Sequence, residues 1–358
     1  MPRTKQIDQW LLSATLTAAA FGIVMVASAS APLAREYFHL PESEFAVRQL
    51  VAVILGAAAM LAAAFVPLEW LTGPKVALTA LGATWIALIA VFFQDPVAGT
   101  YRWLQLPVFS IQPSAIAKVT LPLALASLFA AQAEHRVTES VALRINLAVV
   151  AVTFILVLVE PDLGSALLLL AAAACIFLLA GVSWRPLLIA GTVLVPVVLL
   201  AIALKPYRIE RLRAFLGSTP YQVHQSLIAI GRGGLVGQGP GESVQKLFYL
   251  PAPHNDFIFA VVGEELGFIG GSLLLGVLGV VVVRGFVAAQ RSTSRAQALL
   301  AAGLATTIAI QTLLNVSVCL SLLPAKGLPL PLVSAGGSDV LLTMCAAGLL
   351  LNVAKEGT

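Results

Sequence analysis

The sequence predicts an all-α, polytopic integral membrane protein with about ten transmembrane helices. Of its 358 residues, 59% are hydrophobic and only 11% are charged, which is too little charge to cover a water-soluble globule of this size. Apolar runs close to the roughly 20 residues that span a bilayer recur along the chain. Lys and Arg occupy the short segments between these runs rather than a basic patch, which argues against a nucleic-acid-binding protein.

Each predicted helix is an apolar run between polar, Gly or Pro residues. The first run carries no convincing signal-peptide cleavage pattern, so we expect it to remain as an anchor. The whole chain, 1–358, is expected to form one membrane domain. The predicted spans are residues 10–31, 46–66, 76–93, 114–131, 145–159, 163–181, 187–204, 257–283, 296–323 and 332–353.

An even number of spans places both termini on one side of the membrane. The Lys and Arg residues of the short connections are strongly biased to that side, and the positive-inside rule makes it cytoplasmic. The segment 205–255 then becomes a long extracytoplasmic loop between the seventh and eighth helices. Most carboxylates lie on or near the outer side, so we expect any chemistry to face outward from a bacterial cytoplasmic membrane.

Polar residues at the end of the long loop form the main candidate site. Asp256 stands directly before the apolar run of the eighth helix, at or near its N-cap. Unpaired N–H groups and the helix dipole favour an ionised carboxylate there. Such a group would serve as a general base, as a metal ligand or simply as a helix cap. His254, Glu264 and Glu265 are expected to support it, the last two about two turns further along.

Basic and glycine-rich segments offer contacts for an anionic headgroup. The long loop is basic in its first half and glycine-rich in its second, but it contains neither GxGxxG nor GK[ST]. Its apolar residues favour folding back onto the membrane surface. A second glycine-rich segment precedes the last helix, whose first N–H groups would suit phosphate oxygens. Alternatively, these residues only touch lipid phosphates or form a tight turn. The candidates are Arg102, Arg208, Arg213, Arg232, Lys246, Lys326, Ser334, Gly336, Gly337 and Ser338.

Polar side chains within predicted spans are costly unless they are partnered or functional. Lys118 lies several residues into the fourth span, and Gln311 and Asn315 are four residues apart on one face of the ninth. Asp162 lies in the turn between the fifth and sixth spans. We expect Lys118 and Asn315 to contact a substrate, with Asp162 and Gln311 behind them. The alternatives are that Lys118 extends to the membrane surface and that the amides join helices.

Several motifs, in their order along the chain, resemble the SEDS family (shape, elongation, division and sporulation), bacterial membrane enzymes that polymerise peptidoglycan glycan strands from lipid II. They are YRWLQL, QPSAIAK, EPDLGSAL, QSLIAIGRGGLVGQG, PHNDFIFAVVGEELG and LPLPLVSAGGS. SVQKLFYLP, AKGLPLP and GLLLNV look more like the division branch, FtsW, than the elongation branch, RodA.

The sequence departs from the family pattern at three positions. Ala115 stands where the family usually has Glu, so a local carboxylate partner for Lys118 is missing. Asn255 and Asp339 replace a usual Thr and Ser. The carboxylate of Asp256 is retained.

The resemblance implies an inverting glycosyltransferase. Asp256 would then be the catalytic carboxylate, as general base on the acceptor sugar or as ligand of a divalent cation, Mg²⁺ or Mn²⁺, and undecaprenyl pyrophosphate would leave. The implied partners are lipid II, the nascent glycan strand, a class B penicillin-binding protein (the transpeptidase) and other membrane proteins of the division or elongation machinery. A transporter that moves lipid II across the bilayer and a non-catalytic scaffold are the rival interpretations.

Overall fold

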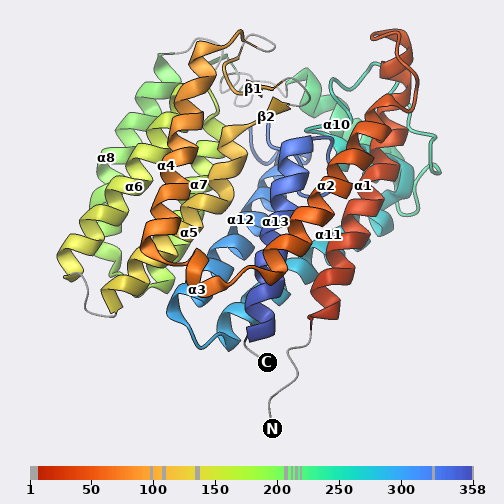
Figure 1. Cartoon of the computed structure of the whole chain (residues 1–358). Coiled ribbons are helices and arrows are strands. Elements are labelled where there is room, and N and C mark those ends of the chain that lie inside the picture. Colours follow the sequence, from red (N-terminus) through yellow and green to blue (C-terminus); the bar gives the residue numbers. More distant parts are fainter. Residues whose placement is uncertain are drawn as a thin grey trace.

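The computed structural model describes residues 7–96, 100–106, 110–133, 138–204, 209–210, 213, 217, 220–324 and 327–356. Long helices run side by side between two ends of a bundle (Figure 1). The elements are α1 (Gln9–Glu36), α2 (Glu44–Phe65), α3 (Leu68–Leu71), α4 (Pro74–Ala90), the 3₁₀ turn η1 (Val91–Phe93), β1 (Leu104–Gln105), β2 (Ser110–Ile111), α5 (Pro113–Ala133), α6 (Glu139–Val159), α7 (Leu163–Leu179), α8 (Trp184–Ala203), α10 (Tyr221–Gly233), α11 (Ile258–Arg291), α12 (Arg295–Cys319) and α13 (Gly337–Glu356).

The predicted fold class is confirmed. Among the described residues, nine helices are long and apolar enough to cross a membrane, and the 17-residue α7 is a further apolar helix. The start of α1 and the end of α13 lie at one end of the bundle, whereas the β1–β2 hairpin and α10 lie at the other (Figure 1). We call the latter the loop end.

The last span begins later than predicted. Residues 327–330 are irregular, residues 331–335 form a turn and a bend, and α13 begins only at Gly337. Leu332 explains the difference, because its φ of 66° is not helical. This turn segment, 327–335, lies beside the candidate site.

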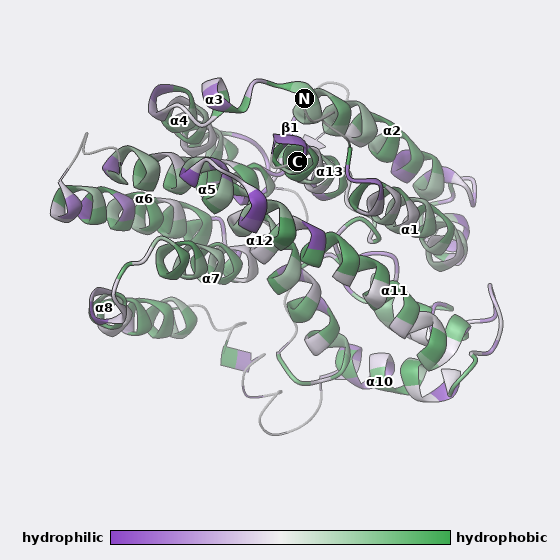
Figure 2. Ribbon diagram, turned by 90° about the horizontal axis from the view of Figure 1, so that it is seen from below, coloured by the Kyte–Doolittle hydropathy of each residue, from purple (hydrophilic) through white to green (hydrophobic). Residues whose placement is uncertain are grey.

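The helices differ sharply in how far the protein buries them. Helices α5, α12 and α13 are mostly enclosed by other helices, whereas α8 has no buried residue. Seen from below, α8 lies at the edge of the bundle and α13 near its centre (Figure 2). Close packing at the centre depends on small residues, as is typical of membrane helices. A Cβ at Gly348 of α13 would come within 2.2 Å of the Met60 carbonyl oxygen of α2.

The part of the long loop that the structure describes folds back, as predicted, but onto α11. Helix α10 buries Val223, Ser226 and Ala229. Leu235 and Val236, which were expected to face the membrane surface, are exposed. The described part of the loop therefore packs one face against α11 and leaves the other face exposed.

Helix α11 is interrupted at Gly267, whose φ of 67° and ψ of −166° are not helical. Four backbone hydrogen bonds join this break to the segment after α10. The N–H groups of Phe268 and Ile269 donate to the carbonyls of Gly234 and Leu235, at 2.9 and 3.0 Å. In return, Gln238 and Gly239 donate to the carbonyls of Glu264 and Glu265, also at 2.9 and 3.0 Å. An interruption at membrane depth requires such replacement partners.

Candidate functional site

Asp256 lies one residue before the N-cap of α11, which is Phe257. This agrees with the predicted position at or near the N-cap. Asp256 is half-buried. Its backbone carbonyl accepts a hydrogen bond from Asn315 Nδ2 at 2.9 Å, and Cys319 Sγ donates to the same oxygen at 3.7 Å. These contacts fix the backbone that carries the carboxylate.

The turn segment 327–335 lies directly against residues 254–256. Ser334 Oγ donates to the carbonyl of Asn255 at 2.6 Å, and the N–H of Ala335 donates to the carbonyl of His254 at 2.9 Å. A Cβ on the exposed Gly327 would lie 3.4 Å from Asp256 Oδ2. Glycine therefore leaves room beside the carboxylate of Asp256.

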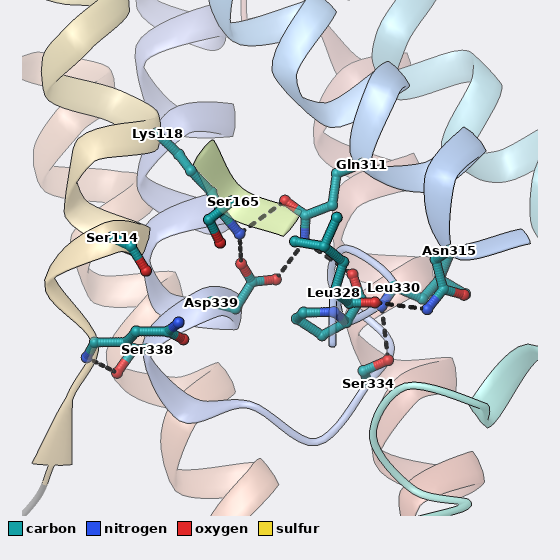
Figure 3. A network of polar contacts seen from close by, with 12 residues as sticks. Ser114, Lys118, Ser165, Gln311, Asn315, Leu328, Leu330, Ser334, Ser338 and Asp339 are labelled. Carbon is teal, nitrogen blue, oxygen red and sulfur yellow. Dashed lines mark hydrogen bonds and ion pairs between the residues drawn. The ribbon is translucent and has the colours of Figure 1, made fainter. Parts of the chain in front are cut away.

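A buried polar network connects this segment to Lys118 (Figure 3). Lys118 Nζ lies 2.5 Å from Asp339 Oδ1 and donates to Gln311 Oε1 at 3.0 Å. Gln311 Nε2 donates to Asp339 Oδ2 and to the Pro329 carbonyl, both at 2.9 Å. All three side chains are buried. Lys118 therefore neither extends to the membrane surface nor presents its ammonium group to a substrate.

Asp339 supplies the carboxylate partner that the sequence seemed to lack. Ala115 removes the expected local partner, but Asp339 from α13 occupies the position opposite Lys118. In the sequence these are two separate departures, 224 residues apart, and they meet only in the fold. The signal was present, because one charge lost and one gained in the same membrane protein suggests a pair.

Asn315 contacts the backbone on both sides of the candidate site. Its Nδ2 donates to the carbonyl of Leu328 at 2.8 Å as well as to that of Asp256. The side chain is 2% exposed, and its Oδ1 has no hydrogen-bond partner among the described residues. In this structure Asn315 thus positions backbone, and its predicted substrate contact stays a prediction.

Glu264 and Glu265 fix the long loop. Both are buried. Glu264 accepts from Ser243 Oγ at 2.5 Å and from two backbone N–H groups, those of Val244 and Gln245, both at 3.2 Å. Glu265 accepts from Ser28 Oγ at 2.6 Å and from the N–H of Gly241 at 3.0 Å. These bonds join α11 to the long loop and to Ser28 of α1.

Lys246 was predicted to bind an anion, and in this structure its ammonium group bonds within the protein. Its ammonium group donates to Glu265 Oε1 at 2.8 Å, to Ser28 Oγ at 2.9 Å and to the Gly241 carbonyl at 2.6 Å. An ammonium has three donors, so none is left. The loop amides of Gly237, Gln238 and Gly239 are also used within the protein.

The other residues predicted to contact an anion fall into two groups, those that bond to backbone and those that are exposed or half-buried. Arg102 donates to the backbone carbonyls of Glu160 and Pro161, and Ser338 Oγ accepts from the N–H of Gln112 and donates to the Ser110 carbonyl, both at 3.2 Å. These two residues, like Ser334, hold the backbone. Arg232 is partly exposed and lies 3.4 Å from Glu264. Gly336 is half-buried, and Gly337 and Arg213 are exposed. Arg208 and Lys326 lie outside the described residues.

Three further polar residues are buried. Asp162 caps α7 through the N–H of Ser165 at 3.0 Å and accepts from Gln112 Nε2 at 3.1 Å. His254 is buried against the Phe45 ring, with centroids 4.9 Å apart, and burial lowers its pKa to about 4. Glu160, which sequence analysis did not select, is fully buried without a partner for either carboxylate oxygen among the described residues. Burial raises its pKa to about 9, so it is protonated at neutral pH.

Asp256 offers a single carboxylate to a metal ion. The residues present therefore fit a metal site only if the substrate supplies further ligands. The described residues contain no group of three or more His, Cys, Asp or Glu side chains arranged for a metal ion. Mg²⁺ is commonly held by one or two carboxylates together with substrate phosphates. A half-buried single carboxylate is consistent with that mode and not with a cage built from protein ligands.

Comparison with known proteins covers almost the whole chain. A family model for FtsW, RodA and SpoVE, described as "Cell cycle protein", matches residues 9–358. The probable peptidoglycan glycosyltransferase FtsW of Coxiella burnetii is 37% identical over 98% of this chain and 96% of its own length. The protein with the same name from Thioalkalivibrio sulfidiphilus is 38% identical over 98% of this chain and 90% of its own.

Solved structures agree with these relatives. One chain, from work on the "structural coordination of polymerization and crosslinking by a peptidoglycan synthase complex", has a TM-score of 0.80 and 27% identity over 98% of both chains. The rod shape determining protein RodA of Thermus thermophilus has a TM-score of 0.72 and 27% identity over 97% of this chain and 96% of its own. The motifs, the helical architecture and these matches agree, and the chain belongs to the FtsW/RodA/SpoVE family, that is, the SEDS family that its sequence resembles.

Proposed function

We propose that this protein is a peptidoglycan glycosyltransferase that polymerises lipid II at the outer face of the bacterial cytoplasmic membrane. The observation that carries the proposal is the half-buried Asp256 beside Gly327, on a backbone fixed by Asn315. The curated relatives carry the name of this activity. Their FtsW name favours a role in cell division over cell elongation.

Asp256 would act as the general base. Its carboxylate accepts the proton of the acceptor sugar hydroxyl while that oxygen forms a bond to the anomeric carbon of the donor. The bond from the anomeric carbon to the pyrophosphate breaks in the same step, and undecaprenyl pyrophosphate leaves with the electron pair. Attack opposite the leaving group inverts the anomeric centre.

A divalent cation would be held by Asp256 together with the substrate's phosphate oxygens. When bound, Mg²⁺ or Mn²⁺ supplies charge neutralisation at the pyrophosphate. Arg232, which is partly exposed, is a candidate for additional charge. Arg208, Arg213 and Lys326 stay candidates from the sequence. Chelation with EDTA should therefore stop polymerisation, and added Mg²⁺ or Mn²⁺ should restore it.

Lipid II and a transpeptidase would be the working partners. The similar chain solved in a complex comes from a system that couples polymerisation to crosslinking, which favours a class B penicillin-binding protein beside this one. Because the start of α1 and the end of α13 lie opposite the loop end (Figure 1), cytoplasmic termini would put Asp256 on the outer side. Other membrane proteins of the division or elongation machinery would join through the same complex.

Polymerisation by purified protein tests the function. Wild type should convert labelled lipid II into glycan strands, and Asp256→Asn should not. Glu42→Gln, which changes an exposed carboxylate paired with Arg35, is the matched control and should retain activity. Strand formation by Asp256→Asn at the wild-type rate would exclude the catalytic assignment.

Reconstituted vesicles separate polymerisation from transport. The transporter alternative required Lys118, Gln311 and Asn315 to line a polar pathway. The structure disfavours it, because these buried groups bond to one another or to backbone. Glycan product without movement of lipid II across the bilayer is expected. Movement without product would favour the transporter, and wall synthesis supported in cells by Asp256→Asn would favour the scaffold.

A further inference from the structure

We propose that Asp339 is a positioning residue for polymerisation. Its buried ion pair with Lys118 holds Gln311 and the turn segment 327–335 in the arrangement that places Asp256. This inference rests on the proposed function and concerns a carboxylate that does not contact the reacting atoms.

The first step is the ion pair itself. Lys118 of α5 and Asp339 of α13 are 8% and 5% exposed, with Nζ and Oδ1 2.5 Å apart. A buried charge that loses its partner is strongly unfavourable. Removal of the Asp339 carboxylate would therefore force Lys118 to change its position or its protonation state.

The second step is the orientation of Gln311. Its Oε1 accepts from Lys118, which directs its Nε2 towards Asp339 Oδ2 and the Pro329 carbonyl (Figure 3). An amide has its acceptor and donors on opposite sides of the group. The charged pair thus determines which side of Gln311 meets Pro329.

The third step leads from Pro329 to Asp256. The neighbouring Leu328 carbonyl accepts from Asn315 Nδ2, which also bonds the Asp256 carbonyl. Ser334, at the other end of the segment, bonds the Asn255 carbonyl. The segment is therefore fastened beside Asp256 at both ends, and a shift at Pro329 reaches the carboxylate through backbone contacts.

The structure also offers a second place for the same charge. Ala115 lies one turn before Lys118 on α5 and is 1% exposed. Side chains three residues apart on a helix are neighbours. A carboxylate at position 115 would face Lys118 from its own helix, so the pair can be moved without moving the lysine.

The test moves the charge and measures polymerisation of lipid II. Asp339→Ser should lower kcat by about 100-fold, the size expected for a small misplacement of a catalytic group, with KM changed less than threefold. Ala115→Glu in the Asp339→Ser background should recover at least a tenth of the wild-type kcat. Ala115→Gln in that background adds a side chain of similar volume without charge, and it should recover nothing.

The outcomes are distinct. Recovery by Ala115→Glu and not by Ala115→Gln supports the proposal, even if Asp339→Ser alone unfolds on purification. A wild-type kcat for Asp339→Ser overturns it, as does equal recovery by Glu and Gln or recovery by neither. If the wild-type protein forms no strands under any condition, the proposed function fails instead, which is a different result.

Discussion

Three carboxylates within ten residues of one motif are used in opposite ways. Glu264 and Glu265 are buried, and both oxygens of each accept hydrogen bonds from the loop. Asp256 is half-buried, beside a glycine that leaves space. The same side-chain chemistry therefore stabilises the fold where the carboxylate is fully buried, and it is suited to a reaction where the side chain is partly accessible. Substitution of Asp256 should therefore affect activity, whereas substitution of Glu264 or Glu265 should affect stability.

The largest expected effect is on activity. Asp256→Asn should lower kcat by about 10²–10⁴-fold, the usual contribution of a general base, and leave the thermal unfolding temperature unchanged. The measurement pairs single-turnover polymerisation with thermal unfolding in detergent. If the unfolding temperature falls as far as for the glutamate variants, the contrast between the two regions is wrong.

Glu265→Gln should act on stability first. It leaves Lys246, which is 6% exposed, without its charged partner, and breaking a buried pair costs about 3–5 kcal/mol. The control is Glu265→Gln with Lys246→Met, which removes both charges and should recover most of the loss. Thermal unfolding measures both. If the single variant is as stable as wild type, the pair does not fasten the loop.

Gly237→Ala tests the close approach of the loop to α11. Gly237 has a φ of 88°, and a Cβ there would lie 2.2 Å from the Glu265 carbonyl oxygen. Gly241 has a similar φ of 85° but open space around its Cβ position. Gly241→Ala should cost about 1 kcal/mol for backbone strain alone, and Gly237→Ala at least about 2 kcal/mol. Equal losses would mean that only backbone conformation matters.

A pH-dependent effect is expected from Glu160, a buried carboxyl group whose oxygens have no hydrogen-bond partner among the described residues. Its pKa rises from an ordinary 4.5 to about 9 on folding, so the folded state binds the proton more tightly. Stability is then complete below about pH 4.5 and declines as the pH rises towards 9, by at most about 1.4 kcal/mol per pH unit. Glu160→Gln should flatten this decline in unfolding temperatures measured from pH 5 to 9. An unchanged slope would show that Glu160 is not its source.

The sequence predicted the helices well because the bilayer imposes a strong, local requirement on each of them. Their composition reveals every span without knowledge of its neighbours. The start of α13 was misplaced because Leu332 and Val333 are apolar, although two prolines precede them. Apolar residues indicate that a segment is buried, but they do not show that it is helical. Here the buried segment is a turn.

The site was predictable only where its signal is local. Asp256 stands out at a change from polar to apolar residues, whereas the partner of Lys118 lies 221 residues away. Lys246 looked like an available cation because nothing nearby in sequence shows that Ser28 and Glu265 occupy it. Whether a side-chain donor already has a hydrogen-bond partner depends on contacts that are distant in the sequence. A single sequence does not reveal such contacts.

The break at Gly267 also bears on how this loop can change during evolution. Four backbone bonds join it to the segment after α10, and backbone groups are common to nearly all residues. The side chains between these bonds are therefore open to substitution, while Gly233, Gly237 and Gly267 are not, since a Cβ at each would come within 2.4 Å of backbone atoms. We expect related proteins to keep these three glycines even where exposed side chains of the loop differ, so that new outer surfaces can arise without moving Asp256.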